Sequence, residues 1–584
     1  MILEKDKIRR CAIFLFFDKD GVVDDYIPHM LEDMRTSVEY ILVISNGFVN
    51  CEGLRKLKAA ADDVYCRANL GLDVGGYREG LFYLGFQKLQ EYDEMVMLNY
   101  TFFAPLYPFS EMFDSMASHD VDFWGITKHH TVIPDPFFIQ PDGILHEHIQ
   151  SFFLVLRTSL FLSYQYKDFM FNMQNPKTYT SSIIDYETIF TKHFEDLDFK
   201  WEIYADTAKY EGYSYCPNMF YIRDMLKDMH CPMIKRRSFF TDYNDFLLNT
   251  CGESSSDLYD YIQENLNYNL NDIWDNILRL ENVSDVHLDM HFNYMLPVEG
   301  TLYEMPKEKN TVIFVVAAWT KRMSWYKRFL KKMPENADIC ILASEESVAA
   351  PIRACIAANP KVSVFYKQAD TSEYKQVFSA MGEVMQNNYQ YVGILYMQDL
   401  ELLRPYSNSA SLQYSDWENI AATQDYVCNI LEVFDKNERL GMIIPPIPQY
   451  GRYFTELADG WAGRYEDVSI LLGEMGINVN LKSQSVPLTP YGGSFWIRQQ
   501  IFSRILEWLI RKEDAEIETI LVAMPYIVQH CGYYTGVAYS DRYAPIAITN
   551  KDYMFRENNK TVFQKYGPNY HSVCVDRIKN NEFL

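Results

Sequence analysis

The sequence lacks any apolar run that approaches the roughly 18 residues needed for a transmembrane helix. Its first apolar run, residues 11–17, ends at Asp18 and has no small-residue cleavage site, so it predicts a buried strand rather than a signal peptide. We therefore expect a cytoplasmic protein that associates at most peripherally with a membrane, at the inner face.

Paired cysteines and an excess of basic residues are also absent. The 11 cysteines are scattered, without a CxxC pair or a cluster of metal ligands, which indicates free thiols in a reducing compartment. Lysine and arginine number 54 against 79 aspartates and glutamates, which gives a formal net charge of −25. This balance argues against a nucleic-acid groove or a broad anionic lipid surface as the main partner.

The residues that are present indicate folded α/β domains. Hydrophobic residues make up 48% of the sequence and aromatic residues 15%, which is ample for packed cores. Continuous apolar runs predict buried strands, and helical patterns lie between them. The runs are residues 11–17, 40–44, 95–98, 152–156, 311–317 and 339–343. Because 584 residues are too many for one core, we predict an α/β domain over 1–230, a helical connecting segment over 231–308 and a second α/β domain over 309–584.

Small and polar residues gather between residues 69 and 127, beginning with the segment NLGLDVGGYREGL. Its glycines indicate sharp turns or a close approach of the backbone, and Asp73 either caps a helix that opens at Tyr77 or contacts a ligand. An apolar strand at 95–98 then ends in Asn99-Tyr-Thr101. Ligands bind α/β sheets at the carboxyl ends of the strands, so this stretch supplies candidate binding residues. They are Asn69, Asp73, Asn99 and Thr101.

The order of these features resembles the nucleotide-sugar half of inverting glycosyltransferases with the GT-A fold. Similarity to the rhamnan synthesis protein F family of polysaccharide rhamnosyltransferases lies in NLGLDVGGYREG, LNYTFFAPLYP, DFWGIT, HIQSFFLVLR, SIIDYETIFTKHF, CPMIKRRSFF and IWDNILRL. The resemblance implies inverting transfer of L-rhamnose from dTDP-L-rhamnose, a nucleotide-sugar donor. The implied acceptor is a lipid-linked or growing polysaccharide.

The resemblance adds further candidates for binding the donor. The family pattern places an acidic residue that reads the nucleoside after the second strand. This sequence has Ser45-Asn46 there, so we expect a hydrogen-bonding role and no charge. Trp124 and Gly125 leave a later strand and resemble the floor of a sugar site, although a buried tryptophan beside a turn has the same pattern.

Metal ions in this fold are usually held by two carboxylates at the end of the central strand. Asn99-Tyr-Thr101 has none, and its side chains are poor ligands for a hard dication, so we expect no metal in the first domain. In the second domain Asp399-Leu-Glu401 leaves a Mg²⁺ or Mn²⁺ site open, against the alternative of a solvated loop. The histidines at 129–130 and at 146 and 148 have no third ligand in reach by sequence.

Inverting transfer needs a base that removes the proton of the acceptor hydroxyl. An acidic pair opens a helix late in the domain of similar enzymes, and Asp185-Tyr-Glu187 matches that place, so Glu187 or Asp185 is the predicted catalytic base. The alternative is a pair of first-turn acids favoured by the helix dipole. The run Lys-Arg-Arg at 235–237 either meets phosphates of a lipid-linked acceptor or is a basic surface run.

The two halves of the sequence share several features at a fixed offset. Three matched residues stand 297 positions apart and precede an apolar strand in each half. They are Asp73, Tyr77 and Tyr92, matched by Asp370, Tyr374 and Tyr389. Further along, and at a different spacing, YETIF at 186–190 resembles IETIL at 517–521, which places Glu518 opposite Glu187. We therefore predict two tandem GT-A-like units. Because an aspartate is missing at Asn99-Tyr-Thr101, a catalytically silent glycan-binding or scaffolding protein is the alternative hypothesis.

Overall fold

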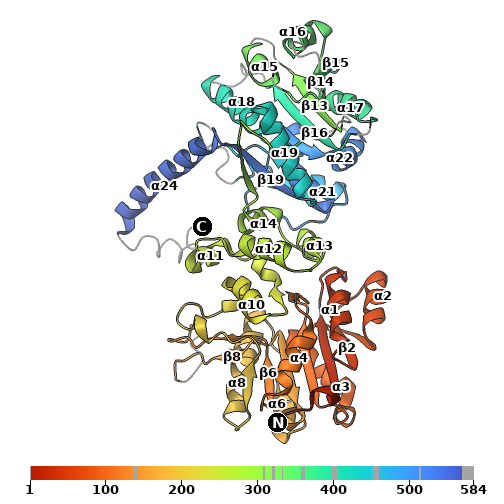
Figure 1. Cartoon of the computed structure of the whole chain (residues 1–584), viewed down its shortest axis with the longest axis vertical. Coiled ribbons are helices and arrows are strands. Elements are labelled where there is room, and N and C mark those ends of the chain that lie inside the picture. The colour runs from red at the N-terminus through yellow and green to blue at the C-terminus, as the bar shows by residue number, and fades with distance from the viewer. Residues whose placement is uncertain are drawn as a thin grey trace. The chain divides into compact units, whose positions relative to one another are not determined.

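The computed structural model forms two compact units, Met1–Ile277 and Leu278–Leu584 (Figure 1). It describes residues 2–136, 142–304, 306, 310–318, 323–331, 333–356, 362–387, 389–397, 406–448, 450, 460–511 and 515–567. The division falls inside helix α13 (Leu270–Leu280). Most of the segment expected to connect the domains, residues 231–277, therefore packs with the first unit, and residues 278–308 belong to the second.

The first unit is built on a seven-stranded mixed sheet in the order β10-β6-β9-β4-β1-β2-β3. Its strands are β1 (Arg10–Phe16), β2 (Tyr40–Asn46), β3 (Asp63–Arg67), β4 (Glu94–Asn99), β6 (Phe123–Gly125), β9 (Phe153–Arg157) and β10 (Trp201–Ile203). β1 pairs in parallel with β2 and β4, and β9 runs antiparallel to both β4 and β6. The predicted buried strands near 11–17, 40–44, 95–98 and 152–156 are confirmed, because each is apolar on both faces.

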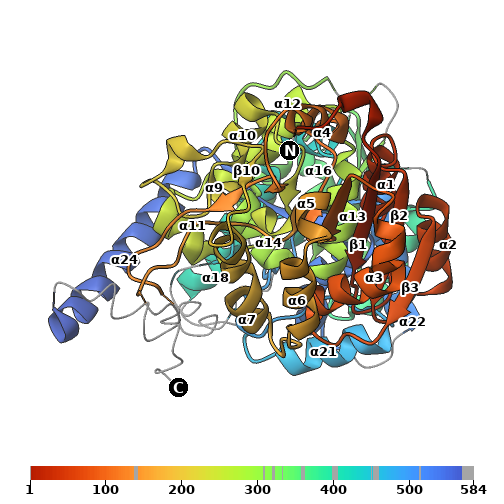
Figure 2. The ribbon, with the colours of Figure 1, turned by 90° about the horizontal axis from the view of Figure 1, so that it is seen from below.

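Helices cover both faces of this sheet. Figure 2 shows α1 (Tyr26–Met34) and α4 (Phe109–Ala117) on one side and α3 (Leu72–Leu89) and α6 (Tyr164–Asn172) on the other. The remaining helices are α2 (Cys51–Ala60), α5 (Thr158–Phe161), α7 (Tyr179–Ser182), α8 (Thr188–Glu195), α9 (Pro217–Phe220), α10 (Ile222–Met229), α11 (Tyr243–Asn249) and α12 (Ser254–Asn265). Short two-stranded pairs join β5 (Phe102–Phe103) to β11 (Ile234–Lys235) and β7 (Lys128–His129) to β8 (His148–Ile149).

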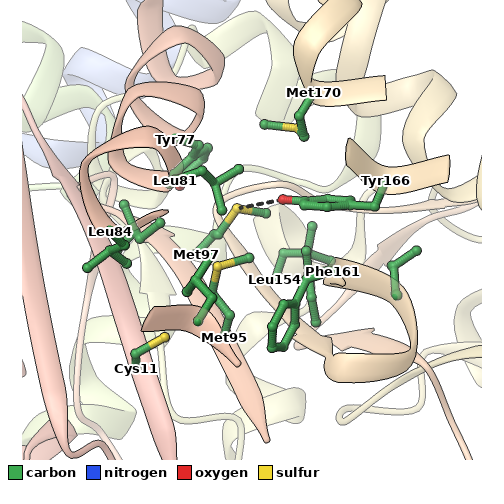
Figure 3. Packing of buried hydrophobic residues seen from close by; sticks show 14 of the residues in the cluster. Cys11, Tyr77, Leu81, Leu84, Met95, Met97, Leu154, Phe161, Tyr166 and Met170 are labelled. Carbon is green, nitrogen blue, oxygen red and sulfur yellow. Dashed lines mark hydrogen bonds between the residues drawn. The ribbon is translucent and has the colours of Figure 1, made fainter. Parts of the chain in front are cut away.

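Two glycines of the segment LDVGGYREG let α3 pack closely on the sheet. A Cβ atom at Gly76 would lie 2.1 Å from Cδ1 of Leu15, and one at Gly80 would lie 2.7 Å from Cγ2 of Ile13. Beneath the helix, Met97 lies in the core among Tyr77, Leu81 and Tyr166, whose hydroxyl donates to the Met97 sulfur at 3.8 Å (Figure 3). These glycines are thus explained by packing of the helix on β1.

The second unit contains an eight-stranded sheet in the order β12-β19-β17-β18-β16-β13-β14-β15. Its strands are β12 (Asn293–Leu296), β13 (Thr311–Ala317), β14 (Ala337–Ala343), β15 (Ser363–Gln368), β16 (Tyr391–Met397), β17 (Leu440–Ile444), β18 (Phe495–Arg498) and β19 (Tyr534–Ser540). β13 pairs in parallel with β14 and β16, while β18 runs antiparallel to β16 and β17. From β19 to β15, this sheet has the same strand order and directions as the first.

The helices of the second unit complete a mixed α/β architecture. Among the described residues they are α14 (Val283–Met290), α15 (Met323–Leu330), α16 (Glu346–Ile356), α17 (Tyr374–Val384), α18 (Tyr406–Ala421), α19 (Gln424–Lys436), α21 (Tyr465–Glu474), α22 (Gln499–Arg511), α23 (Ile517–His530) and α24 (Ala544–Tyr566). Within the described ranges, every helix is too short or too polar to span a bilayer. The predicted α/β class with parallel strand pairs is confirmed.

Candidate functional site

The carboxyl end of β4 holds a hydrogen-bonded group of three polar side chains. Asn99 donates from Nδ2 to Oδ2 of Asp73 at 2.8 Å. Its Oδ1 accepts from the backbone N–H and the hydroxyl of Thr101, at 3.1 Å and 2.7 Å. Three of the residues predicted near the ligand are therefore in direct contact, at the edge where α/β sheets bind ligands.

Asp73 reaches this group because α3 begins earlier than the sequence predicts. The helix starts at Leu72, directly after Gly71, which has a φ of 78°. Asp73 therefore lies in the first helical turn, and the prediction that it caps a helix opening at Tyr77 is wrong. The left-handed conformation of Gly71 sets the start of the helix, which turns the carboxylate toward Asn99.

Glu187 comes to the same place from another part of the chain. The helix expected to open at Asp185-Tyr-Glu187 begins earlier, because α7 continues through a π-helical turn (Ile183–Glu187) into α8. Oε2 of Glu187 accepts the backbone N–H of Ser151 at 2.8 Å and is also hydrogen-bonded by the Ser151 hydroxyl. Glu187 and Asp73 both line a cavity of about 60 Å³, together with Tyr77 and Ser151.

Burial shifts the pKa values of two groups that line this cavity, Asp73 and Tyr77. Burial raises the pKa of Asp73 to about 6; the hydrogen bond from Asn99 and the charge of Lys235 oppose this rise, and the charge of Glu187 adds to it. Burial also raises the pKa of Tyr77, as do the charges of Asp73 and Glu187. The Tyr77 hydroxyl is buried and has no hydrogen-bond partner among the described residues. A ligand in the cavity would find an unused hydroxyl beside two carboxyl groups.

Lys235 is a site residue that the sequence analysis named only as part of the basic run at 235–237. It lies opposite Phe102 in the β5–β11 pair, which brings its Nζ to 3.5 Å from the Thr101 hydroxyl and 3.5 Å from the ring centroid of Phe152. Burial lowers its pKa to about 8, and the charges of Glu187, Cys216 and Asp73 oppose that shift.

The next two residues of the basic run, Arg236 and Arg237, do not share the position of Lys235. Arg236 is buried and donates to Oδ1 of Asn276 at 2.7 Å, whereas Arg237 is exposed. The alternative of a basic surface run at 235–237 is therefore wrong for its first two members. The sequence signal that could have identified Lys235 is the apolar segment Cys231-Pro-Met-Ile directly before it. Such a segment predicts that the backbone leading to Lys235 is buried.

Asp185 faces a different space from Glu187. It is exposed and lines a pocket of about 540 Å³, whose wall also includes Phe169, Asn172, Tyr186 and His193. Asn172 donates to Asp168 at 2.9 Å in the same wall. The structure thus separates the two predicted bases: Glu187 joins Asp73, and Asp185 belongs to the neighbouring pocket.

Other predicted donor-binding residues have structural contacts. Asn46 donates to the carbonyl oxygen of Leu72 at 2.9 Å and accepts from Arg67, which ties the end of β2 to the start of α3. Ser45 is buried and donates to the Gly47 carbonyl at 3.2 Å. Asn69 is exposed in the loop before α3.

Trp124 and Gly125 belong to the core. Trp124 is 0% exposed, and its Nε1 donates to the buried Glu94 at 3.3 Å. A Cβ atom at Gly125 would lie 2.2 Å from Cγ2 of Ile149, so the glycine allows close packing of β6 against β8. The prediction that they form the floor of a sugar site is wrong, because a fully enclosed indole presents no face to a ligand.

Histidines near the site are not arranged for metal binding. The rings of His129 and His148 stack with centroids 5.2 Å apart. Burial lowers the pKa of His129 to about 4, and the neighbouring His148 adds to this, so the ring is neutral at physiological pH. In the part of the chain that the structure describes, no three histidine, cysteine, aspartate or glutamate side chains are grouped to hold a metal ion.

The second unit shows only part of its predicted site. Asp370 is exposed and accepts from the backbone N–H and hydroxyl of Ser372 at 3.0 Å and 2.7 Å, so it caps a local turn. Glu518 lies in the first turn of α23, and its charge adds to the effect of burial in raising the pKa of Tyr396 near the end of β16. Asp399 and Glu401 lie outside the described residues.

Several solved structures are similar to this chain at low sequence identity. The mannosyltransferase PcManGT from Pyrobaculum calidifontis, in complex with GDP-Man and Mn²⁺, has 8% identity and a TM-score of 0.25, over 41% of this chain and 59% of that chain. Apo-form glycosyltransferase GlyE from Streptococcus pneumoniae TIGR4 has 11% identity and a TM-score of 0.23, over 65% and 84%. Core-mannan synthase A from Aspergillus fumigatus has 10% identity and a TM-score of 0.18, over 29% and 68%. At such TM-scores these similarities carry no weight for substrate or mechanism.

The match to a family model covers more of the chain than the matches to solved structures do. No curated protein matches the chain. The family model for RgpF, rhamnan synthesis protein F, matches residues 41–529, which is most of the chain and includes every residue of the β4 site. The chain therefore belongs to the rhamnan synthesis protein F family and is a glycosyltransferase.

Proposed function

We propose that the first unit transfers L-rhamnose, with inversion, from dTDP-L-rhamnose to a lipid-linked or growing polysaccharide. The observation that supports this most is the convergence of Asp73, Asn99 and Glu187 at the end of β4. These residues come from three separate segments of a chain that belongs to a glycosyltransferase family. Their convergence supports a binding and reaction site rather than three independent structural contacts.

The donor would bind at the end of β4. Asp73 has a carboxylate oxygen for the hydroxyl or N–H groups of the nucleotide, and Asn99 fixes its orientation. The unpaired hydroxyl of Tyr77 supplies a further group that a ligand could satisfy. A buried polar group without a partner costs stability, so a ligand that fills it gains affinity.

Glu187 has the properties of the base. Ser151 holds Oε2 from its backbone N–H and hydroxyl, while Oε1 makes no hydrogen bond to any described residue. In the proposed reaction the acceptor oxygen attacks the anomeric carbon and its proton passes to the Glu187 carboxylate. The bond from the anomeric carbon to the diphosphate breaks on the opposite face, and dTDP leaves with the bonding electrons.

The pocket beside Glu187 suits a glycan acceptor. It combines the aromatic rings of Phe169 and Tyr186 with the polar groups of Asp168, Asn172 and Asp185. Sugars offer both apolar ring faces and hydroxyls, and a pocket of this composition can contact both. Phe169, Tyr186 and Met173 also line the smaller cavity, so the two spaces adjoin. In this proposal Asp185 contacts the acceptor and is not the base.

The second unit is proposed to be a second GT-A-like copy. Support comes from the seven strands that repeat the order and directions of the first sheet, with β16 in the place of β4. A nucleotide-sugar site at the end of β16, with Glu518 near it and Mg²⁺ or Mn²⁺ bound by Asp399 and Glu401, stays a prediction.

Release of nucleoside diphosphate tests the proposal. The chain is incubated with dTDP-L-rhamnose, dTDP-glucose, UDP-glucose or GDP-mannose, with and without a rhamnan acceptor, and free diphosphate is measured. We expect release from dTDP-L-rhamnose that increases with acceptor. Thermal stabilisation by the donors without any release would favour a silent glycan-binding protein. Release from another donor alone would show that the proposed sugar is wrong.

A further inference from the structure

The strand end that usually holds a metal ion does not fit one in the first unit. Asn99 directs its amide N–H₂ at Asp73, and its carbonyl oxygen already accepts two hydrogen bonds from Thr101. Neither side chain carries a charge, and hard dications prefer carboxylate ligands. The ammonium of Lys235 lies 3.5 Å from the Thr101 hydroxyl, where it would repel a bound dication.

Lys235 is held in this place by backbone structure. Its strand, β11, pairs antiparallel with β5, and the backbone N–H of Arg236 donates to the Thr101 carbonyl at 3.1 Å. The side chain crosses the face of Phe152, whose ring centroid is 3.5 Å from Nζ. Because β5 directly follows the end of β4, this pairing fixes a cation beside the binding edge of the sheet.

The ammonium has unused hydrogen-bonding capacity. A lysine has three donors, and the described residues offer Lys235 one oxygen, the Thr101 hydroxyl, at a distance near the limit for a hydrogen bond. It forms no ion pair with a described carboxylate, although the charges of Asp73 and Glu187 act on it. A half-buried cation in this state is poised to bind an anion.

We propose that Lys235 binds the diphosphate of the sugar nucleotide in place of a metal ion, so that the first unit works without divalent cations. The inference rests on the proposed function, because it assigns a role within that site. The ammonium would neutralise the diphosphate when the donor binds, and also the negative charge that grows on the leaving group as the sugar–phosphate bond breaks.

Binding of nucleotides that differ only in their phosphates tests this role. Calorimetry on the full chain compares dTDP with thymidine for wild type, Lys235→Met, Lys235→Arg and Lys209→Met. Lys209 is an exposed lysine of the same unit, paired with Asp228 at 2.8 Å, and controls for the loss of one charge. We expect Lys235→Met to lose about 10- to 100-fold in dTDP affinity and to keep its thymidine affinity. Lys235→Arg should recover part of the loss, and Lys209→Met should match wild type.

The metal requirement is measured in the same experiment. The dTDP binding that Lys235→Met weakens should have the same affinity with EDTA as with Mn²⁺. Dependence of that binding on Mn²⁺, or equal dTDP affinity in wild type and Lys235→Met, would overturn the inference. An equal loss for thymidine and dTDP would assign Lys235 a structural role and would also overturn it.

A panel with UDP and GDP separates this inference from the proposed donor. Binding of UDP or GDP instead of dTDP, weakened in Lys235→Met, would contradict the donor and support the role of Lys235. If the chain binds dTDP and Lys235→Met leaves that binding unchanged, the result would support the proposed donor and contradict the role of Lys235.

Discussion

Replacing Asp73 by asparagine should stabilise the first unit at neutral pH while weakening donor binding. The carboxyl group has an ordinary pKa of 3.8 and a pKa of about 6 in the folded chain, chiefly because of burial. Between these values the folded chain retains a proton that the unfolded chain has released. The free energy of unfolding therefore falls as the pH rises from about 4 to about 6, and the cost persists at higher pH.

The size of the effect follows from the shift. A displacement from 3.8 to about 6 corresponds to about 3 kcal/mol, at about 1.36 kcal/mol for each pKa unit. Asp73 is partly exposed, and solvent screens part of this cost, so we expect about 1 to 3 kcal/mol. Asparagine has no charge to bury and can still bond to Asn99, so Asp73→Asn should recover this energy at pH 7.5. At pH 4.5 the gain should shrink to about a third.

Differential scanning calorimetry of the full chain measures the gain. Asp73→Asn should raise the transition of the first unit by a few degrees at pH 7.5 and by less at pH 4.5. Asp228→Asn is the matched control: the ion pair with Lys209 lowers the pKa of Asp228, so that variant should show no gain. A gain that is equal at both pH values, or a loss of stability at pH 7.5, would refute the reasoning.

Three further predictions concern the same site and the packing of helix α3 that carries Asp73. Asn99→Ala should weaken dTDP-L-rhamnose binding by about 1 to 3 kcal/mol in calorimetry, since it frees Asp73 from its hydrogen bond; unchanged affinity would contradict the assignment. Gly76→Ala should lower the free energy of unfolding by about 1 to 3 kcal/mol in urea titrations, because its Cβ would lie 2.1 Å from Leu15. The pH profile of kcat/KM should fall below about 6, as Asp73 gains a proton, and above about 8, as Lys235 loses one; a flat profile would show that neither charge matters.

Much of the fold was predictable because its central strands are buried on both faces. Such strands leave continuous apolar runs, as in residues 11–17 and 311–317, and both are strands in the structure. Helix starts were harder to predict. The start of α3 depends on the backbone conformation of Gly71, and the segment before α8 is already helical, which no apolar pattern reveals.

Site residues could be predicted only where a known sequence pattern places them at a strand end or in the loop before a helix. Asp73 and Asn99 stand at the loop and strand end of a familiar pattern, and the structure joins them. Lys235 reaches Thr101 through the pairing of two short strands more than 130 residues apart in sequence, a contact that local pattern does not encode. The prediction for Trp124 was wrong because a tryptophan in the core and a tryptophan at a sugar site have the same sequence pattern.

Turnover by two glutamine variants tests the central claim, that chemistry occurs at Glu187 in the first unit. Glutamine keeps the shape of the side chain but accepts no proton. Glu187→Gln should therefore lower kcat on the order of 100-fold or more, with donor affinity retained. Glu518→Gln, at the matching place in the second unit, should leave this turnover unchanged, as should Glu195→Gln at the exposed end of α8. Normal turnover by Glu187→Gln together with a dead Glu518→Gln would contradict the account and place the reaction in the second unit.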